Sequence, residues 1–185
     1  MTTILGLSGS LRRTSFNSGL LRAAQQVAPD GVTLTIGSIR DVPLYDGDLE
    51  AAEGIPAAVR SLTDQLAAAD GLLLATPEYN NGVPGVLKNA IDWMSRGDGL
   101  KIFRGKPVAV IGASPGNFGT AHAQSHWLPV LRMLNTRPWF EGRLMVSRAG
   151  GLFDKQGELT DEGTRQKLAD FVAGFAASLN AREIR

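Results

Sequence analysis

Residues 71–89 read GLLLATPEYNNGVPGVLKN. The first five form a short continuous apolar run, which is typical of a strand buried on both faces. Pro84 favours the first turn of a helix, and apolar side chains follow it at helical spacing. The intervening PEYNNG holds more polar residues than a tight turn requires. The stretch therefore predicts a buried strand, a loop suited to a flat polar ligand, and a helix.

The same alternation of strand and helix extends in both directions along the chain. Strands are expected at residues 4–7, 32–36, 71–75 and 107–113, with a fifth within 137–147. Helices are expected at residues 15–28, 56–69, 84–94, 120–134 and 168–179. Segments 41–50 and 96–106 are interpreted as a turn-rich loop and a solvated connection. The pattern predicts an α/β fold, with residues 1–185 forming one doubly wound domain around a five-stranded parallel sheet covered by helices on both faces.

Composition excludes several classes of protein. Of the 185 residues, 43% are hydrophobic and 20% are charged, and 19 basic residues against 18 acidic ones give a net charge of +1. Nucleic-acid and anionic-membrane partners need clustered positive charge, so neither is expected. The chain has no cysteine, which excludes disulfides, thiolate metal sites and a cysteine nucleophile.

The N-terminal sequence MTTILGLSGSLRR has no basic residue before its apolar part. It therefore does not resemble a signal peptide. No run approaches the roughly 20 apolar residues that a membrane-spanning helix needs. We expect a cytoplasmic protein.

Ligands of doubly wound sheets bind beyond the carboxyl ends of the strands, where the strand order reverses. Three unusual loops are expected there, at residues 9–19, 76–85 and 112–119. The first loop, GSLRRTSFNSG, fits neither the dinucleotide-binding pattern nor the P-loop. Its hydroxyl, amide and guanidinium donors suit a terminal phosphate, whose three oxygens need many partners. The alternative is that Ser15 or Asn17 only caps a helix and the arginines are solvated.

The second and third loops offer room for a planar ring. Gly82 and Gly85 permit close backbone approach, Asn80 both donates and accepts, and Tyr79 presents a ring. The third loop, GASPGNFG, adds Ser114 and free backbone amides. A tight turn and a flexible connection are the respective alternatives. Together the three loops predict a monophosphate at one end and a hydrogen-bonding ring at the other, which among common cofactors indicates flavin mononucleotide (FMN).

Two other site types fit less well. His122 and His126 have a metal-pair spacing but no third ligand accompanies them, so no metal site is predicted. Ser8 lies in GLSGS, but Ser10 stands where a hydrolase nucleophile elbow has its last glycine.

The segments GSLRRTSFN (9–17) and PEYNNGVPGVLKNAIDWMSR (77–96) resemble the NADPH-dependent FMN reductase family. GASPGNFG (112–119) and FDKQGELTDEGTRQKL (153–168) are similar to members of the chromate and quinone reductase type. The resemblance implies a flavodoxin-like fold. It places the FMN-binding positions at Ser10, Arg12, Ser15, Asn17, Ser18, Pro77, Glu78, Tyr79, Asn80, Ser114 and Gly116.

The resemblance further implies an FMN-dependent NAD(P)H oxidoreductase that passes hydride through the flavin to quinones, or to chromate, azo dyes or free flavin. No catalytic side chain is predicted, because the flavin carries the redox chemistry. A homodimer or homotetramer is also implied, and the helix His122–Leu134, with Trp127 expected on its exposed side, is the predicted contact. Many relatives differ at Asn81–Gly82, which leaves the acceptor open, and preference for NADPH over NADH requires a cation such as Arg13 at the extra phosphate.

Two further classes stay open. A flavodoxin-type electron carrier without its own NAD(P)H turnover would use the same flavin site. Such carriers usually dock through a strongly acidic face, which a net charge of +1 does not favour. A module that binds another phosphorylated ligand would share the fold.

Overall fold

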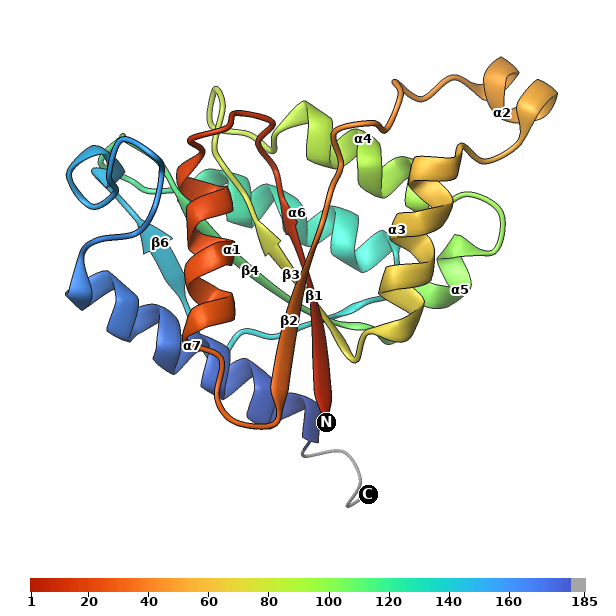
Figure 1. The fold of residues 1–185 in the computed structure, drawn as a ribbon. Helices are drawn as coiled ribbons and strands as arrows, with labels where there is room; N and C mark the ends of the chain where they lie inside the picture. The colour runs from red at the N-terminus through yellow and green to blue at the C-terminus, as the bar shows by residue number, and fades with distance from the viewer. Residues whose placement is uncertain (181–185) are drawn as a thin grey trace.

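The computed structural model describes residues 1–180, and its centre is a twisted sheet in which every strand pairing is parallel. The strands are β1 (Thr2–Ser8), β2 (Val32–Gly37), β3 (Gly71–Ala75), β4 (Pro107–Ala113), β5 (Arg137–Pro138) and β6 (Leu144–Val146). Their order is β2-β1-β3-β4-β5, with β6 also paired to β4 (Figure 1). This is the flavodoxin-like order, as predicted.

The fifth strand of the sequence prediction forms as two short pieces along one edge. β5 pairs with the start of β4 at Pro107 and Val108, and β6 pairs with its end at Ile111–Ala113. Residues 139–143 connect the two pieces outside the sheet. The prediction of a strand within 137–147 is therefore confirmed, although the strand is interrupted.

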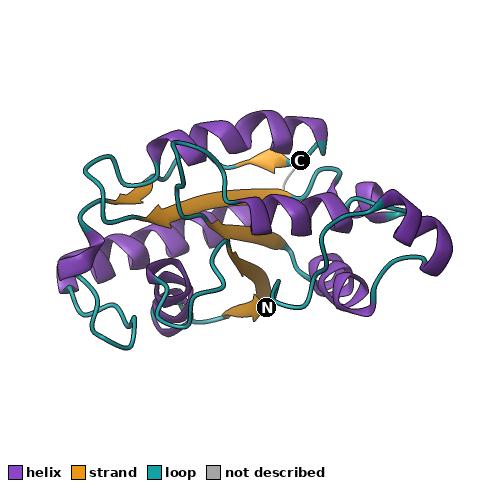
Figure 2. Cartoon of the chain, turned by 90° about the horizontal axis from the view of Figure 1, so that it is seen from above, coloured by secondary structure: helices purple, strands orange, loops and turns teal. Residues whose placement is uncertain are grey.

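Helices cover both faces of the sheet, as the view from above shows (Figure 2). They are α1 (Phe16–Gln26), α2 (Gly47–Glu53), α3 (Ala57–Ala68), α4 (Gly85–Met94), α5 (Gly99–Phe103), α6 (Ala121–Met133) and α7 (Glu162–Asn180), with a 3-10 turn at Ala149–Gly151. Helices α1 and α7 bury an apolar core that includes Leu20 and Phe175 on one face. Helices α3, α4 and α6 bury a second core that includes Leu62 and Leu87 on the other.

Three sequence expectations are corrected. The segment expected as a turn-rich loop contains the start of α2, which Asp46 caps by accepting the Asp48 amide at 2.9 Å. The connection at residues 96–106 contains α5, whose Phe103 is fully buried. Trp127, expected on an exposed side of its helix, is also fully buried. The sequence did not predict α2 and α5 because both helices are short and lie in polar segments. Trp127 is buried because α6 directs its indole toward Thr76, at the end of β3.

Strand order decides where the loops lie. Strand β1 has β2 on one side and β3 on the other, so the order reverses between β1 and β3. The loops after β1, β3 and β4 therefore emerge side by side at one edge of the sheet (Figure 1). Within residues 1–180, no helix is both long and apolar enough to cross a membrane.

Candidate functional site

Backbone contacts hold the three loops together at the carboxyl ends of β1, β3 and β4. The Gly9 amide donates to Ala75 O at 2.9 Å, and the Thr76 amide donates to Ile111 O at 2.8 Å. A Cβ atom on Gly9 would lie 2.7 Å from both Pro77 and Pro84. The first loop therefore needs glycine at this position to pack against the second.

Hydroxyl groups of the first loop accept backbone hydrogen bonds and keep their own protons. Ser15 caps α1 by accepting the Ser18 amide at 3.3 Å, and Ser10 Oγ accepts the Arg12 amide at 3.3 Å. Each hydroxyl can still donate to an anion at the start of α1, where free amides and the helix dipole favour negative charge. The Arg12 side chain is exposed and has no hydrogen-bond partner among residues 1–180.

Two predicted site residues of the same loop are engaged with the protein. Asn17 is 3% exposed; its Nδ2 donates to Ala113 O at 2.9 Å and its Oδ1 accepts the Ala113 amide at 2.9 Å. This pair of bonds joins the start of α1 to the end of β4. Ser18 Oγ lies 2.9 Å from Ser8 Oγ. Both side chains fix the position of the loop, and their contact with a ligand stays a prediction.

The second loop contains a type I′ turn at Tyr79–Gly82. Tyr79 and Gly82 exchange backbone hydrogen bonds at 3.3 and 2.9 Å, and Asn80 and Asn81 have φ values of 50° and 59°. Asparagine tolerates this left-handed conformation, which explains the Asn-Asn pair. The turn projects the Tyr79 ring, which is 53% exposed, and the Asn80 amide out of the fold.

The loop is anchored to α6 by two contacts, one partly buried and one buried. Glu78 Oε2 accepts the Ala123 amide at 2.9 Å, so this carboxylate binds the start of α6. Trp127 Nε1 donates to Thr76 Oγ1 at 3.0 Å, and Thr76 Oγ1 donates to Pro77 O at 2.8 Å. Thr76 and Trp127 were not predicted as site residues, because nothing in the sequence links positions this far apart.

The third loop is held by one hydrogen bond within itself and by others to residues 148–149. Ser114 is buried, its Oγ donates to Gly119 O at 2.5 Å, and its carbonyl accepts the Ala149 amide at 3.0 Å. The Arg148 amide donates to Gly116 O at 3.0 Å. Phe118, which sequence reasoning did not select, is 73% exposed, and its ring centroid lies 6.0 Å from that of His122.

The donor set fits FMN. The first loop, residues 9–19, contains no acidic residue, and its hydroxyls, amides and Arg12 suit a phosphate. Tyr79, Asn80 and the exposed part of the third loop lie on neighbouring strand ends and offer ring and amide contacts to a planar heterocycle. The predicted positions from all three loops are thus brought to one edge of the sheet.

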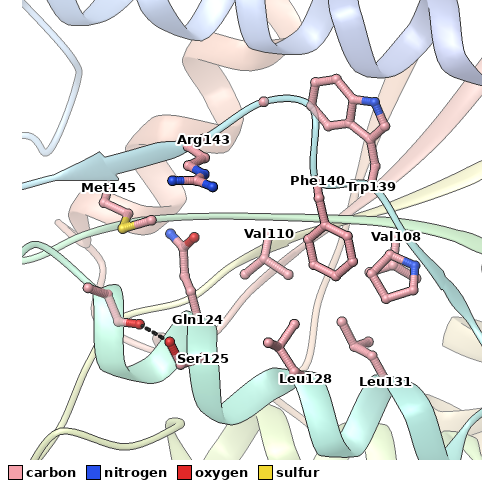
Figure 3. Close-up of a pocket in the computed structure, with 13 residues that line it drawn as sticks. Val108, Val110, Gln124, Ser125, Leu128, Leu131, Trp139, Phe140, Arg143 and Met145 are labelled. Carbon is pink, nitrogen blue, oxygen red and sulfur yellow. Dashed lines mark hydrogen bonds between the residues drawn. The ribbon is translucent and has the colours of Figure 1, made fainter.

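A cavity of about 380 Å³ lies between α6 and the segment after β5, and none of the predicted site residues lines it (Figure 3). Its walls include the apolar side chains Val110, Leu128, Phe140 and Met145. We do not assign the flavin to it, because it lies against the sheet edge rather than at the three strand ends. His122 and His126 are exposed on α6, and among residues 1–180 no three His, Asp or Glu side chains group closely enough to bind a metal ion.

Comparisons of the sequence and of the structure with known proteins agree with each other. The model of the family described as NADPH-dependent FMN reductase matches residues 2–151. An NAD(P)H-dependent FMN reductase from Pseudomonas aeruginosa is 47% identical, over 89% of this chain and 88% of that protein. A 2-hydroxy-1,4-benzoquinone reductase from Burkholderia sp is 40% identical, over 95% of each. The structure of the flavoenzyme FerB, an NAD(P)H:(acceptor) oxidoreductase from Paracoccus denitrificans, superimposes with a TM-score of 0.86 at 35% identity and covers 98% of both chains.

Proposed function

This chain belongs to the NADPH-dependent FMN reductase family, and we propose that its three loops hold FMN at the carboxyl edge of the sheet. Its activity is that of an NAD(P)H-dependent flavin and quinone reductase. Family members use FMN and NAD(P)H, and the Burkholderia relative is a benzoquinone reductase. The main support for the proposal is that three loops with hydrogen-bond donors meet at adjacent strand ends.

Each loop has a distinct part in holding the cofactor. Ser10, Arg12 and Ser15 donate to the phosphate, with the first amides of α1 beside them. Asn17 and Ser18 keep that loop in place from below. Charge-assisted donors of this kind are stronger than neutral ones, so the phosphate is the main anchor of the cofactor.

The other two loops border the ring. Tyr79 and Asn80 form one wall, while Pro77 and Glu78 set the position of that wall through the backbone and α6. The Ser114 amide already donates to Val146 O at 3.0 Å, so the Gly116 amide is the one we assign to negative charge beside the ring, because fixed dipoles need no reorganisation during reaction. Bound FMN supplies the redox chemistry by accepting and releasing a hydride equivalent.

We further propose that residues 1–185 form one FMN-binding domain and that the protein assembles as a homodimer or homotetramer. Quinones are the proposed electron acceptors. Chromate, azo dyes and free flavin are alternative acceptors for the same site. NADPH and NADH are both proposed hydride donors.

The test is the cofactor of the purified protein. We expect a yellow protein whose acid extract contains FMN and no FAD, and which oxidises NADPH or NADH when a benzoquinone is added. A colourless protein that takes up no added FMN would refute the cofactor assignment. A yellow protein that does not oxidise either nucleotide would instead indicate an electron carrier.

A further inference from the structure

A second cavity, of about 260 Å³, lies between the first loop, α1 and the end of β2. Four guanidinium groups line it, from Arg12, Arg13, Arg22 and Arg40, and no carboxylate does. Only Arg22 of these four has an acidic partner, Glu158, so Arg12, Arg13 and Arg40 form no ion pair within residues 1–180. Unpaired like charges gathered at one cavity attract an anion.

The four arginines differ in what they already bind. Arg22 is neutralised, since its Nε donates to Glu158 at 2.6 Å and its Nη2 to Gly157 O at 3.0 Å. Arg40 donates one Nη2 bond to Leu11 O at 2.6 Å, which directs its guanidinium toward the first loop. The Arg13 side chain is exposed and, within residues 1–180, has no hydrogen-bond partner. Arg13 and the remaining donors of Arg40 are thus available to a ligand.

The same cavity has an apolar part. Leu11 is 36% exposed and Ile36 is 38% exposed, and both line the cavity beside the arginines. Ser38 Oγ accepts the Arg40 amide at 3.3 Å and keeps its proton for donation. An apolar surface next to guanidinium and hydroxyl donors fits a ligand that joins a flat ring to a phosphate.

We propose that this cavity binds the adenosine 2′-phosphate of NADPH and so makes the enzyme prefer NADPH to NADH. The adenine lies against Leu11 and Ile36, and Arg13 and Arg40 bind the 2′-phosphate. The inference rests on the proposed function, which supplies the nicotinamide nucleotide as hydride donor.

The cavity is separate from the proposed FMN phosphate position. Ser15, which caps α1, does not line it, and neither does Asn17. Ile36 and Gly37 of β2, at the outer edge of the sheet, line it, whereas the flavin ring is proposed beside β3 and β4. Arg12, Ser10 and Ser18 stand between the two positions and border both.

Binding of adenosine monophosphates tests the site without relying on catalysis. In calorimetry on FMN-loaded protein, we expect 2′-AMP to bind at least about tenfold more tightly than 5′-AMP, because only the former places its phosphate between the arginines. Arg13→Ala should weaken 2′-AMP binding about tenfold or more and leave 5′-AMP unchanged. The matched control is Arg104→Ala, since Arg104 is exposed at the opposite end of β4 and should change neither.

Steady-state kinetics provide the second measurement. Arg13→Ala should raise KM for NADPH about tenfold or more, with KM for NADH and the FMN content unchanged. Loss of FMN from Arg13→Ala without a change in nucleotide preference would overturn the proposal, since the cavity would then serve the flavin phosphate. Equal affinity of the wild-type protein for 2′-AMP and 5′-AMP would overturn it as well, and this comparison needs no variant. A protein without FMN refutes the proposed function, while 2′-AMP binding still decides the cavity.

Discussion

Ser10 and Ser15 each accept a backbone amide through Oγ, and neither hydroxyl donates to a protein acceptor among residues 1–180. Asn17 has its amide oxygen and nitrogen bound to Ala113. The predicted site residues thus divide into donors left for a ligand and side chains that position the loop. Arg12 belongs to the first group, and its exposed guanidinium makes it the strongest single donor.

Removing Arg12 should weaken the phosphate contact. Arg12→Ala is expected to lower FMN affinity by about 1.5–3 kcal/mol, because one charge-assisted contact is lost. Riboflavin has no phosphate, so its affinity should change little. Fluorescence titration of both flavins into apoprotein measures the difference, with Arg104→Ala as control. Equal losses for the two flavins would mean that Arg12 acts on folding.

The exposed Tyr79 ring gives a second prediction at this scale. Tyr79→Ala should change kcat/KM for a quinone several-fold while the protein retains its FMN, because the ring borders the open site and does not anchor the phosphate. Tyr45→Ala is a useful control, since Tyr45 is exposed but packs on Trp93, at a ring-centroid distance of 4.9 Å. Release of FMN from Tyr79→Ala with unchanged quinone kinetics would contradict this role.

At the scale of elements, hydrogen bonds connect helices to the loops of the site. Asn17 joins α1 to β4, Glu78 joins the second loop to α6, and Trp127 joins α6 to Thr76. These contacts cross large separations in the sequence. They connect the first loop to β4 and the second loop to α6.

Asn17→Ala tests this connection. The substitution leaves the buried amide and carbonyl of Ala113 without partners, which should reduce the free energy of unfolding by about 2 kcal/mol or more. Urea denaturation measures the change. Asn117→Ala is the matched control, because Asn117 is exposed and its Oδ1 accepts a single bond from Arg148 at 3.1 Å, so its effect should be small. Equal effects of the two substitutions would show that the Asn17 bonds add no stability.

At the scale of the whole molecule, the order β2-β1-β3-β4-β5 places the reversal point between β1 and β3. Loops from distant parts of the chain therefore share one edge, where Tyr79 and Phe118 are both exposed. The nucleotide and the acceptor are expected to bind at this edge in turn.

A single shared site predicts ping-pong kinetics. Double-reciprocal plots at several quinone concentrations should give parallel lines for NADPH, because the oxidised nucleotide leaves before the acceptor binds. Product inhibition by NADP should then be competitive with the quinone. Intersecting lines would indicate a ternary complex and would reject the shared site without affecting the FMN assignment.

Assembly belongs to this scale too. With Trp127 buried, α6 exposes Leu128 (43%) and Met133 (74%), and we keep α6 as the proposed subunit contact on these side chains. Light scattering should give a dimer or tetramer, and Met133→Asp should lower the mass. Leu44→Asp is the control, because Leu44 is 81% exposed and precedes α2. A wild-type monomer at high concentration, or dissociation by Leu44→Asp alone, would contradict this contact.

The sequence by itself determined the fold class and the location of the three loops. Runs such as GLLLA and PVAVIGA are short, apolar and bounded by turn residues, and these local properties predict buried parallel strands. The loops were found because hydroxyl, amide and glycine residues at strand ends are a local signal as well. The correspondence of PEYN and GSLRR to a known family then indicated the ligand.

Only the tertiary structure decided which of these side chains are free to bind a ligand. Asn17 and Ser114 could not be distinguished from ligand-binding residues by sequence, because their partners are the backbones of Ala113 and Gly119. The cavity of Arg13 and Arg40 was equally hidden, since the end of β2 meets the first loop only through the parallel pairing of β1 and β2. Local composition fixes strands and turns, whereas hydrogen-bond partners and clustered charges depend on contacts between residues far apart in the chain.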